Sequence, residues 1–362
     1  MDDSPYPLPP AIKGRGAVSA RPSARFDDKG RESDGDWLDL REGIDGEGPP
    51  PRTEVTIEHP RTILTRNQSP DIPFDRSINA YRGCEHGCIY CFARPTHAYQ
   101  NLSPGLDFET KLFAKPDAAA LLRKELAKPA YRCAPIAIGT NTDPYQPIEE
   151  RYRITREILE VLAEHDHPVV ITTKSARVVR DLDLLGPMAA RGLTSVMMSV
   201  TTLDPVLARR MEPRASAPRQ RIAAIRALSE AGVPTSISVS PIVPAINDHE
   251  IEAIVEAGAE AGARNAFSIA VRLPHEVAPL FREWLAVHYP DRAAKVMALI
   301  GAMRGGRDNA PDFFDRFRPK GAYAAALHAR FRLACRRHGL NAVRFEVRTD
   351  LFRVPTNQLS LL

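Results

Sequence analysis

Cysteine is scarce in this sequence: only five occur among 362 residues, at positions 84, 88, 91, 133 and 335. Three of them lie close together, and the other two are too few to bind a second four-cysteine cluster. The sequence also lacks an apolar run long enough to span a membrane, and it lacks an N-terminal apolar stretch behind a basic patch. We therefore expect a protein of the reducing cytoplasm, with no membrane association and no disulfide framework.

Hydrophobic periodicity is absent from the N-terminal part of the chain, which is rich in Pro, Gly, Asp, Arg and Ser and ends in Gly46-Glu47-Gly48-Pro49-Pro50-Pro51. Such a composition buries too little apolar surface to hold a fold, so residues 1–53 are expected to form a disordered or loosely packed arm. The rest of the chain can form a barrel-sized domain with extensions. We place the barrel in residues 54–275 and a helical C-terminal extension in residues 276–362.

Short apolar segments alternate with helical patterns through the middle of the chain. The expected strands are Ser77–Tyr81, Pro135–Gly139, Pro168–Thr172, Ser195–Val200, Thr235–Val239 and Ala266–Val271. The helical patterns between them are Thr155–Ala163, Arg177–Arg191, Ala217–Ala231 and Asp248–Ala261. Repeated βα units with buried strands indicate an α/β fold with a parallel sheet, which right-handed crossovers curl into a complete or partial barrel.

The segment Arg82-Gly83-Cys84-Glu85-His86-Gly87-Cys88-Ile89-Tyr90-Cys91 spaces three cysteines as C-x3-C-x2-C. A 4Fe-4S cluster normally takes four thiolates, so three thiolates from one tight loop leave one iron open to another molecule. Gly83 and Gly87 let the backbone fold closely around such a cluster. A zinc site formed by the three thiolates with His86 or His97 is the alternative. The expected metal ligands are Cys84, Cys88 and Cys91.

Polar residues follow the predicted strands at their C-terminal ends, where barrels carry their chemistry. Examples are Gly139-Thr140-Asn141-Thr142-Asp143, Thr172-Thr173-Lys174-Ser175 and Ser199-Val200-Thr201-Thr202. Helix capping by Thr, Ser and Asp explains part of this pattern. It does not explain Lys174 or Arg272, which are not helix N-caps. Two cationic side chains at strand ends favour an anionic ligand such as a carboxylate or a phosphate.

Together with the cysteine loop, the segments 142–149, 155–156, 172–175 and 180–183 resemble the spore photoproduct lyase-like branch of the radical S-adenosylmethionine (SAM) superfamily. The resemblance covers roughly residues 55–362. It implies a partial (β/α)6 TIM-like barrel that holds a 4Fe-4S cluster and SAM. In that family an electron passes from the cluster to SAM, which splits into methionine and a 5'-deoxyadenosyl radical that abstracts hydrogen from the substrate.

The resemblance also implies roles for single residues in binding SAM. Lys174 and Ser199 are expected to contact its carboxylate, and Tyr90 is expected to lie at the cofactor beside the third cysteine. The amino or ribose side is expected near Asn141, Thr142 and Asp143. Further candidates are Glu212 and Arg214.

Spore photoproduct lyases resemble one another in using a cysteine as a later hydrogen donor, and Thr140 stands at the corresponding place in this sequence. Cys133 lies at the start of the second predicted strand, at the wrong end of the barrel. Spore photoproduct lyase activity itself is therefore not implied. Tyr99 and Tyr145 are candidate hydrogen relays, and each is also suited to packing in a core or anchoring a loop.

The C-terminal part of the chain is strongly basic. Between Arg304 and Arg353 it has eleven arginines and one lysine against four aspartates and one glutamate, a local charge of +7 compared with +4 for the whole chain. Interleaved aromatic residues suit a nucleic-acid surface, because phosphates bind arginine and bases stack on rings. An amphipathic helix over Gly321–Gly339 with a solvated arginine face accounts for the pattern equally well. The aromatic residues are Phe313, Phe314, Phe317, Tyr323, Phe331, Phe345 and Phe352.

The last five residues resemble the short peptide by which bacterial replication and repair proteins dock on the DNA sliding clamp. Three leucines can enter an apolar pocket while the glutamine bonds at its rim, although packing of this tail on the barrel is an equal alternative. The residues are Gln358, Leu359, Ser360, Leu361 and Leu362.

These patterns predict a radical SAM enzyme that acts on DNA or another nucleic acid in a repair-lyase-like reaction and needs an electron donor protein. Two alternatives stay open. One is radical SAM modification of RNA or a peptide, and the other is a zinc-stabilised nucleic-acid-binding module.

Overall fold

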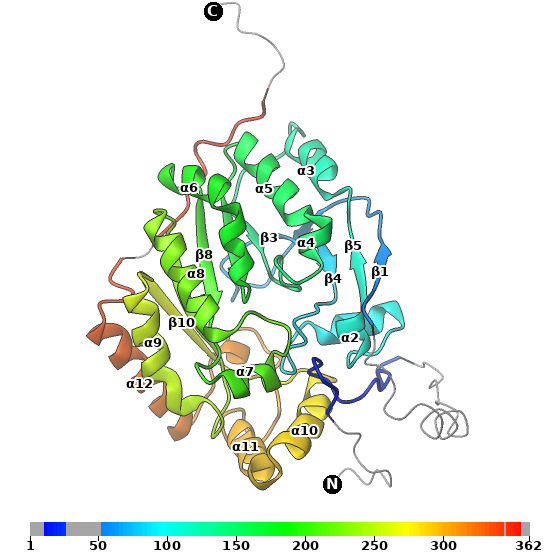
Figure 1. The fold of residues 1–362 in the computed structure, drawn as a ribbon, viewed down its shortest axis with the longest axis vertical. Helices are drawn as coiled ribbons and strands as arrows, with labels where there is room; N and C mark the ends of the chain where they lie inside the picture. Colours follow the sequence, from blue (N-terminus) through cyan, green and yellow to red (C-terminus); the bar gives the residue numbers. More distant parts are fainter. Residues whose placement is uncertain (1–10, 27–51, 344, 356–362) are drawn as a thin grey trace, which may run out of the picture.

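Six parallel strands form the centre of the structure, a computed structural model that describes residues 11–26, 52–343 and 345–355 (Figure 1). In the sheet, β2 is followed by β3, β6, β7, β8, β9 and β10. Their bounds are β2 Leu64–Arg66, β3 Arg76–Ile78, β6 Ile136–Ile138, β7 Val169–Thr173, β8 Thr194–Ser199, β9 Thr235–Ile242 and β10 Asn265–Ala270. All neighbours from β3 to β10 pair in parallel, and β2 pairs antiparallel with β3. The predicted α/β class is confirmed, with a strand at each of the six predicted places.

The barrel stays open, because β2 and β10 lie at opposite ends of the sheet order and do not pair within the described residues. Helices follow the strands and cover the outer face of the sheet (Figure 1). They are α5 Ile154–Glu164, α6 Leu182–Ala190, α8 Pro218–Glu230 and α9 Ile251–Glu260. The 3-10 turn η2 (Ala176–Asp181) replaces the first part of the helix predicted at 177–191. In the part of the chain that the structure describes, no helix is long and apolar enough to cross a membrane.

Alternate side chains of the strands face two environments, as the pleat of a strand requires. In β9, Ile237 and Val239 face the helices and belong to the main core. A Cβ atom on Gly258 of α9 would lie 2.6 Å from the Ile237 side chain, so this helix packs directly on the strand. The serines that alternate with these two residues therefore face the inside of the barrel. They are Ser236, Ser238 and Ser240.

The inward positions of the neighbouring strands also carry small hydroxyl residues. By the same alternation they include Ser77 in β3, Thr172 in β7 and Ser199 in β8. The register of the sheet places Ser199 beside Ser238. A filled TIM barrel packs its inside with bulky branched side chains. The same register also places Met197 beside Ser236 and Phe267 beside Ser238. The inside of this barrel therefore combines hydroxyl groups with apolar side chains.

A second sheet, of three strands in the order β1-β5-β4, carries the cysteine loop. Its bounds are β1 Glu54–Ile57, β4 Tyr81–Arg82 and β5 Lys111–Ala114, and it is joined by α2 Asp107–Thr110 and α3 Ala118–Leu126. The strand predicted at Ser77–Tyr81 is in fact divided between the two sheets, because β3 ends at Ile78 and β4 begins at Tyr81. The short break lets the chain leave the barrel just before the cysteines.

The C-terminal part adds helices on two sides of the barrel (Figure 1). These are α10 Val277–His288, α11 Pro290–Ala302, η4 Asp315–Phe317 and α12 Ala322–Arg337. The remaining elements, earlier in the chain, are η1 Arg94–Gln100, α4 Glu149–Tyr152, α7 Pro205–Met211 and η3 Asp248–Glu250. Helices α10 and α11 share a core with Ile89 and Tyr90 of the cysteine loop. After α12 the chain returns across the barrel, where the Arg348 N–H donates to the Gly192 carbonyl and the Arg353 N–H to the His165 carbonyl. These contacts lie at the starts of β7 and β8, so the described C-terminus covers the end opposite the cysteines.

Candidate functional site

Three free thiols lie on consecutive turns of the loop that follows β4. The Cys84 carbonyl accepts a hydrogen bond from the Gly87 N–H at 3.3 Å, and the Cys88 carbonyl accepts one from the Cys91 N–H at 3.2 Å. Gly87 has a φ of 66°, a left-handed conformation that favours glycine. The loop therefore folds back on itself and carries all three cysteines as one compact unit.

The Arg94 guanidinium holds this loop in place by hydrogen bonds to its backbone carbonyls. It is fully buried, and it donates to the carbonyls of Cys88 at 2.8 Å and Gly87 at 3.1 Å. It also donates to the carbonyls of Pro104 and Gly105 and pairs with the buried Glu109 carboxylate. The planar fork of arginine offers five N–H donors, and each of them has an acceptor here. Arg94 is thus the main internal support of the second half of the cysteine loop.

Residues 11–26 cover the same side of the loop. The backbone N–H groups of Gly16 and Ala17 donate to the Glu109 carboxylate at 2.9 and 2.8 Å. A Cβ atom on Gly16 would lie 1.8 Å from the Gly87 carbonyl oxygen, so only glycine allows this approach. We call residues 11–26 the N-terminal strap. For these residues the prediction of a loosely packed arm is wrong. The prediction rested on side-chain composition, whereas the strap is held by backbone N–H groups that bind a buried carboxylate.

The strap is also held by α10. The Ser19 hydroxyl donates to Glu283 at 2.7 Å, and Arg25 Nε donates to Glu276 at 2.6 Å. Ala17 is fully buried and belongs to the core shared by α10 and the cysteine loop. The strap therefore joins the cysteine loop to the C-terminal helices.

From the barrel side, two residues after β6 hold the first half of the cysteine loop. Thr142 Oγ1 donates to the Gly83 carbonyl at 2.7 Å. Gln146 is fully buried, accepts from the Glu85 N–H at 2.9 Å and donates to Thr142 Oγ1 at 2.8 Å. The predicted SAM-binding residue Thr142 thus positions the loop. Its neighbour Asn141 is exposed, and the Asn141 backbone N–H donates to Asn79 Oδ1 at 3.0 Å.

Asp143 joins the cysteine loop to the end of β7. Its carboxylate accepts from Thr173 Oγ1 and the Lys174 N–H, both at 2.7 Å, and lies 3.4 Å from His86 Nδ1. Burial on its own raises the pKa of Asp143, but His86 and these donors outweigh it and lower the pKa to about 2. In the structure Asp143 is a positioning residue, and its contact with SAM stays a prediction.

Lys174 lies at the centre of the predicted SAM site. Its Nζ is 5.9 Å from the centre of the Tyr90 ring, and among the described residues it has no hydrogen-bond or ion-pair partner. Burial alone lowers the pKa of Lys174, but the neighbouring Cys88 and Glu212 outweigh this effect and raise it. The structure therefore brings Lys174 and Tyr90 together beside a cysteine, as the sequence predicted, and leaves the ammonium available to an anionic ligand.

Glu212 ties this region together. Its carboxylate accepts from the Tyr90 hydroxyl, from Thr201 Oγ1 at 2.6 Å and from Arg221, which forms a fully buried ion pair with it. Arg221 also donates to the Ser199 carbonyl at 3.1 Å. The predicted residues Tyr90 and Ser199 are thus fixed to one buried network at the ends of the strands.

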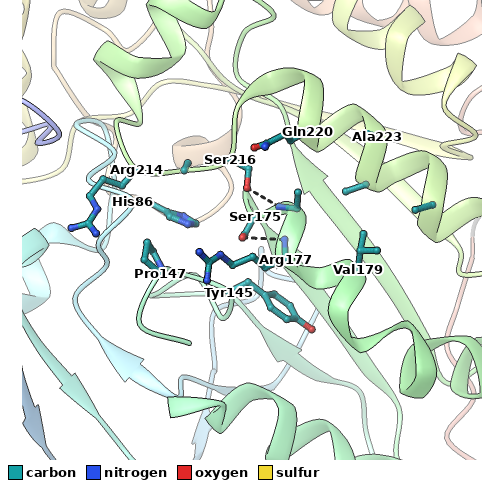
Figure 2. Close-up of a pocket in the computed structure, with 14 residues that line it drawn as sticks. His86, Tyr145, Pro147, Ser175, Arg177, Val179, Arg214, Ser216, Gln220 and Ala223 are labelled. Atoms are coloured by element: carbon teal, nitrogen blue, oxygen red, sulfur yellow. Dashed lines mark hydrogen bonds between the residues drawn. The ribbon is translucent and has the colours of Figure 1, made fainter. Parts of the chain in front are cut away.

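A cavity of about 680 Å³ lies beside the cysteine loop, between η2 and α8 (Figure 2). His86 and Arg214 form one wall, and Arg177 reaches toward them from the opposite side (Figure 2). Both arginines are already paired with carboxylates, Glu85 at 2.9 Å and Glu150 at 2.5 Å. Neither Lys174 nor Ser199 lines this cavity, but Ser175, which follows Lys174, and His86 do.

The two candidate relay tyrosines have structural contacts. Tyr145 is fully buried, and its hydroxyl donates to Asp181 at 3.0 Å. Tyr99 is 66% exposed and packs edge-on against Phe26 of the strap, with 5.3 Å between ring centres. These positions give both residues a packing role, and a relay role stays a prediction.

The donor set fits a cluster rather than a single metal ion. A zinc site needs its ligands to converge on one point, and within the described residues no three Cys, His, Asp or Glu side chains do so. A 4Fe-4S cluster spreads its thiolates over different irons, which suits three cysteines on separate turns of one loop.

Comparison with known proteins defines the class. The family model of the radical SAM superfamily matches residues 78–258. An uncharacterised protein of Mycobacterium tuberculosis (strain ATCC 25618 / H37Rv) is 36% identical over 265 residues, which cover 73% of this chain and 76% of that protein. The chain belongs to the radical SAM superfamily, as the cysteine loop predicted. Its cofactors are therefore a 4Fe-4S cluster and SAM.

Solved structures of spore photoproduct lyase share the fold. One, complexed with dinucleoside spore photoproduct, has a TM-score of 0.57 at 18% identity and covers 81% of this chain and 86% of its own. A variant with bound AdoMet and the same dinucleoside has a TM-score of 0.55 at 17% identity and covers 79% and 80%. The likeness confirms the predicted architecture.

Sequence reasoning missed four buried residues that hold the site: Arg94, Glu109, Gln146 and Arg221. All four bind main-chain groups, which have no sequence signature of their own. Gln146 lies within the 142–149 segment that carried the family resemblance, so that segment was a usable signal. Arg221 lies in a helix with an ordinary apolar face, and nothing in its sequence context distinguishes it from a surface arginine.

Proposed function

We propose that this protein is a radical SAM enzyme that acts on a nucleic acid in a repair-lyase-like reaction. The observation that carries the radical SAM part of the proposal is the position of Lys174. Its largely desolvated ammonium forms no direct hydrogen bond or ion pair with the described residues, so the carboxylate of SAM can bind it directly. Its place beside Cys88 and Tyr90 puts that carboxylate next to the cluster loop.

The residues of this chain position the cofactors and exclude water. When bound, the cluster and SAM supply a hydrogen-abstracting radical. Arg94 and Thr142 hold the two halves of the loop in place, and Lys174 orients SAM through its carboxylate. The core formed with α10 and the strap shields the loop from solvent behind the cysteines, which protects a reactive intermediate from side reactions.

Two observations support a nucleic-acid substrate. Two of the similar solved structures contain dinucleoside spore photoproduct, and β8 and β9 carry serine hydroxyl groups at inward positions, where they can bind the polar edges of a base. By the family resemblance, Thr140 occupies the position of the cysteine that donates hydrogen in spore photoproduct lyases. We therefore propose that the reaction ends through another hydrogen donor and that its product differs from repaired spore photoproduct.

Product analysis tests the proposal. Anaerobically reduced enzyme with SAM is incubated with ultraviolet-damaged DNA, undamaged DNA, RNA and unrelated peptides, and the products are identified by mass spectrometry. We expect a SAM-dependent change in damaged DNA that Lys174→Ala reduces strongly. A product formed only from RNA or peptide would overturn DNA as the substrate, and zinc uptake without iron would overturn the radical reaction.

We also propose two protein partners. The first is an electron donor protein, which the family chemistry requires. The second is the DNA sliding clamp, which would bind Gln358, Leu359, Leu361 and Leu362; these residues lie outside the described part of the chain. Titration of purified clamp with a peptide spanning residues 353–362 tests the second partner. We expect micromolar binding that is lost when Gln358 and Leu361 are both replaced by alanine, and absence of binding would refute it.

A further inference from the structure

Phenylalanine and arginine side chains alternate beside the cysteine loop, in a cluster that joins Arg272 to aromatic residues of the predicted basic surface. The Arg272 guanidinium carbon lies 4.8 Å from the centre of the Phe92 ring and 5.2 Å from that of Phe317. The Arg316 guanidinium carbon lies 5.0 Å from the Phe317 ring and 5.1 Å from the Phe313 ring. We call these five residues, together with the neighbouring pair Phe314 and Arg318, the Phe–Arg ladder. Phe92 directly follows the third cysteine, so the ladder begins at the cluster loop.

Buried contacts hold the ladder in place. Arg304, only 4% exposed, donates to the carbonyls at the end of β10, just before Arg272. Asp71 accepts from Arg316 at 2.5 and 2.7 Å and from the Phe314 N–H at 2.9 Å. Phe314 has a φ of 66°, which is costly for a phenylalanine and persists only where the surroundings enforce it. The ladder is therefore part of the built structure rather than a chance contact of surface side chains.

Two cations at the ladder have no carboxylate partner. Arg272 contacts only the two rings, and the Arg318 guanidinium lies 5.8 Å from the centre of the Phe314 ring. Within the described residues neither side chain forms a hydrogen bond or an ion pair. Their planar N–H donors match the geometry of a phosphate group. The ladder thus presents unsatisfied positive charge next to the cluster loop.

Exposed rings surround these cations. Of the four exposed phenylalanines in the described residues, three lie here: Phe92 is 46% exposed, Phe313 53% and Phe314 45%. Clustered exposed apolar groups mark interaction sites. Aromatic rings interleaved with arginines are typical of surfaces that bind single-stranded nucleic acid, where bases stack on rings and phosphates bind arginine. An acidic peptide would satisfy the arginines but leave the flat rings without a matching partner.

We propose that the Phe–Arg ladder binds a single-stranded segment of nucleic acid and leads one nucleotide to the cluster loop. Bases stack on Phe313, Phe314 and Phe92, while phosphates bind Arg272 and Arg318. This inference rests on the proposed function and names where and how its substrate is held. Because only unpaired bases expose both faces, the ladder favours single strands and locally opened duplexes over intact duplex.

Fluorescence anisotropy with a short labelled single strand and its duplex tests the ladder on the full-length protein. We expect wild type to bind the single strand more tightly, with an affinity that falls as salt rises. Replacing Phe313 and Phe314 together by alanine should weaken binding by about tenfold or more. Arg272→Gln should weaken it and reduce the salt dependence. Leu333→Ala is the matched control, because it removes a side chain that is 52% exposed on α12, outside the ladder.

Two results would overturn the proposed role of the ladder. One is that the ladder variants bind the single strand as tightly as wild type. The other is that an acidic peptide binds at these residues while no nucleic acid does. The wild-type product analysis separates this failure from that of the proposed function. If wild type converts damaged DNA while the ladder variants keep full affinity, only the ladder is wrong. If wild type converts no nucleic acid, the proposed function fails whatever the binding data show.

Discussion

Removal of the Arg94 side chain should release the cysteine loop. In Arg94→Ala, the buried Glu109 carboxylate loses its cation, and the carbonyls of Gly87 and Cys88 lose a donor. Breaking a buried ion pair by removing one partner costs about 3–5 kcal/mol. At about 1.4 kcal/mol per factor of ten, the loop should open roughly a hundredfold to several thousandfold more often.

Two assays report this opening. Iron content after anaerobic reconstitution should fall well below the roughly four irons of a 4Fe-4S cluster, and hydrogen exchange at the loop amides should accelerate by the same factor. Arg123→Ala is the control, because it breaks an ion pair with Glu164 in which both side chains are 48% exposed. Exposed pairs contribute at most about 1 kcal/mol, so this variant should keep its iron. Full iron content and wild-type exchange in Arg94→Ala would refute the role given to Arg94.

Three further predictions concern the ligands, the cofactor and the response to pH. Cys133→Ala should keep the cluster, whereas Cys88→Ala should lose it, and iron analysis with electron paramagnetic resonance distinguishes the two; iron loss in Cys133→Ala would contradict the assignment. Lys174→Met should weaken SAM binding by about tenfold or more while iron is retained, since a charge-assisted hydrogen bond contributes about 1.5–3 kcal/mol; unchanged affinity by calorimetry would return Lys174 to a structural role. Burial lowers the pKa of His167 to about 4, below the value of about 6.5 in an unfolded chain, so the stability that it contributes is complete above about pH 6.5 and is lost as the pH falls toward 4. His167→Gln should reduce this loss, which is at most about 1.4 kcal/mol per pH unit, and urea denaturation at several pH values measures it; an identical pH dependence in the variant would argue against it.

The strands and the cysteine loop could be predicted because their signals are local. In β9, serines alternate with Ile237 and Val239 along one segment, and the spacing of the cysteines is read from ten residues. Lys174 was identified because a lysine does not cap a helix, and the structure places it beside Tyr90. For such residues, the residue type and its position in the sequence are enough to predict the role.

Contacts between distant backbone atoms could not be predicted. Arg94 holds the loop through backbone carbonyls that lie beside it only in the folded chain. Gly16 is required because its backbone lies against Gly87, which is distant from it in the sequence. For Tyr145 the sequence identified a tyrosine near the site but not the direction of its hydroxyl, which points to Asp181. The predicted basic surface is divided as well, because Arg348 and Arg353 lie at the end of the barrel opposite the cysteines.

The N-terminal strap has a consequence for the order of biosynthesis. The strap leaves the ribosome first, but Ser19 binds Glu283, a residue 264 positions later in the chain. Its docking place is therefore complete only after α10 has been made. Until then only the contacts with Glu109 and Gly87 can hold the strap. The strap is thus fixed on both the cysteine loop and α10 only after nearly the whole barrel has been made.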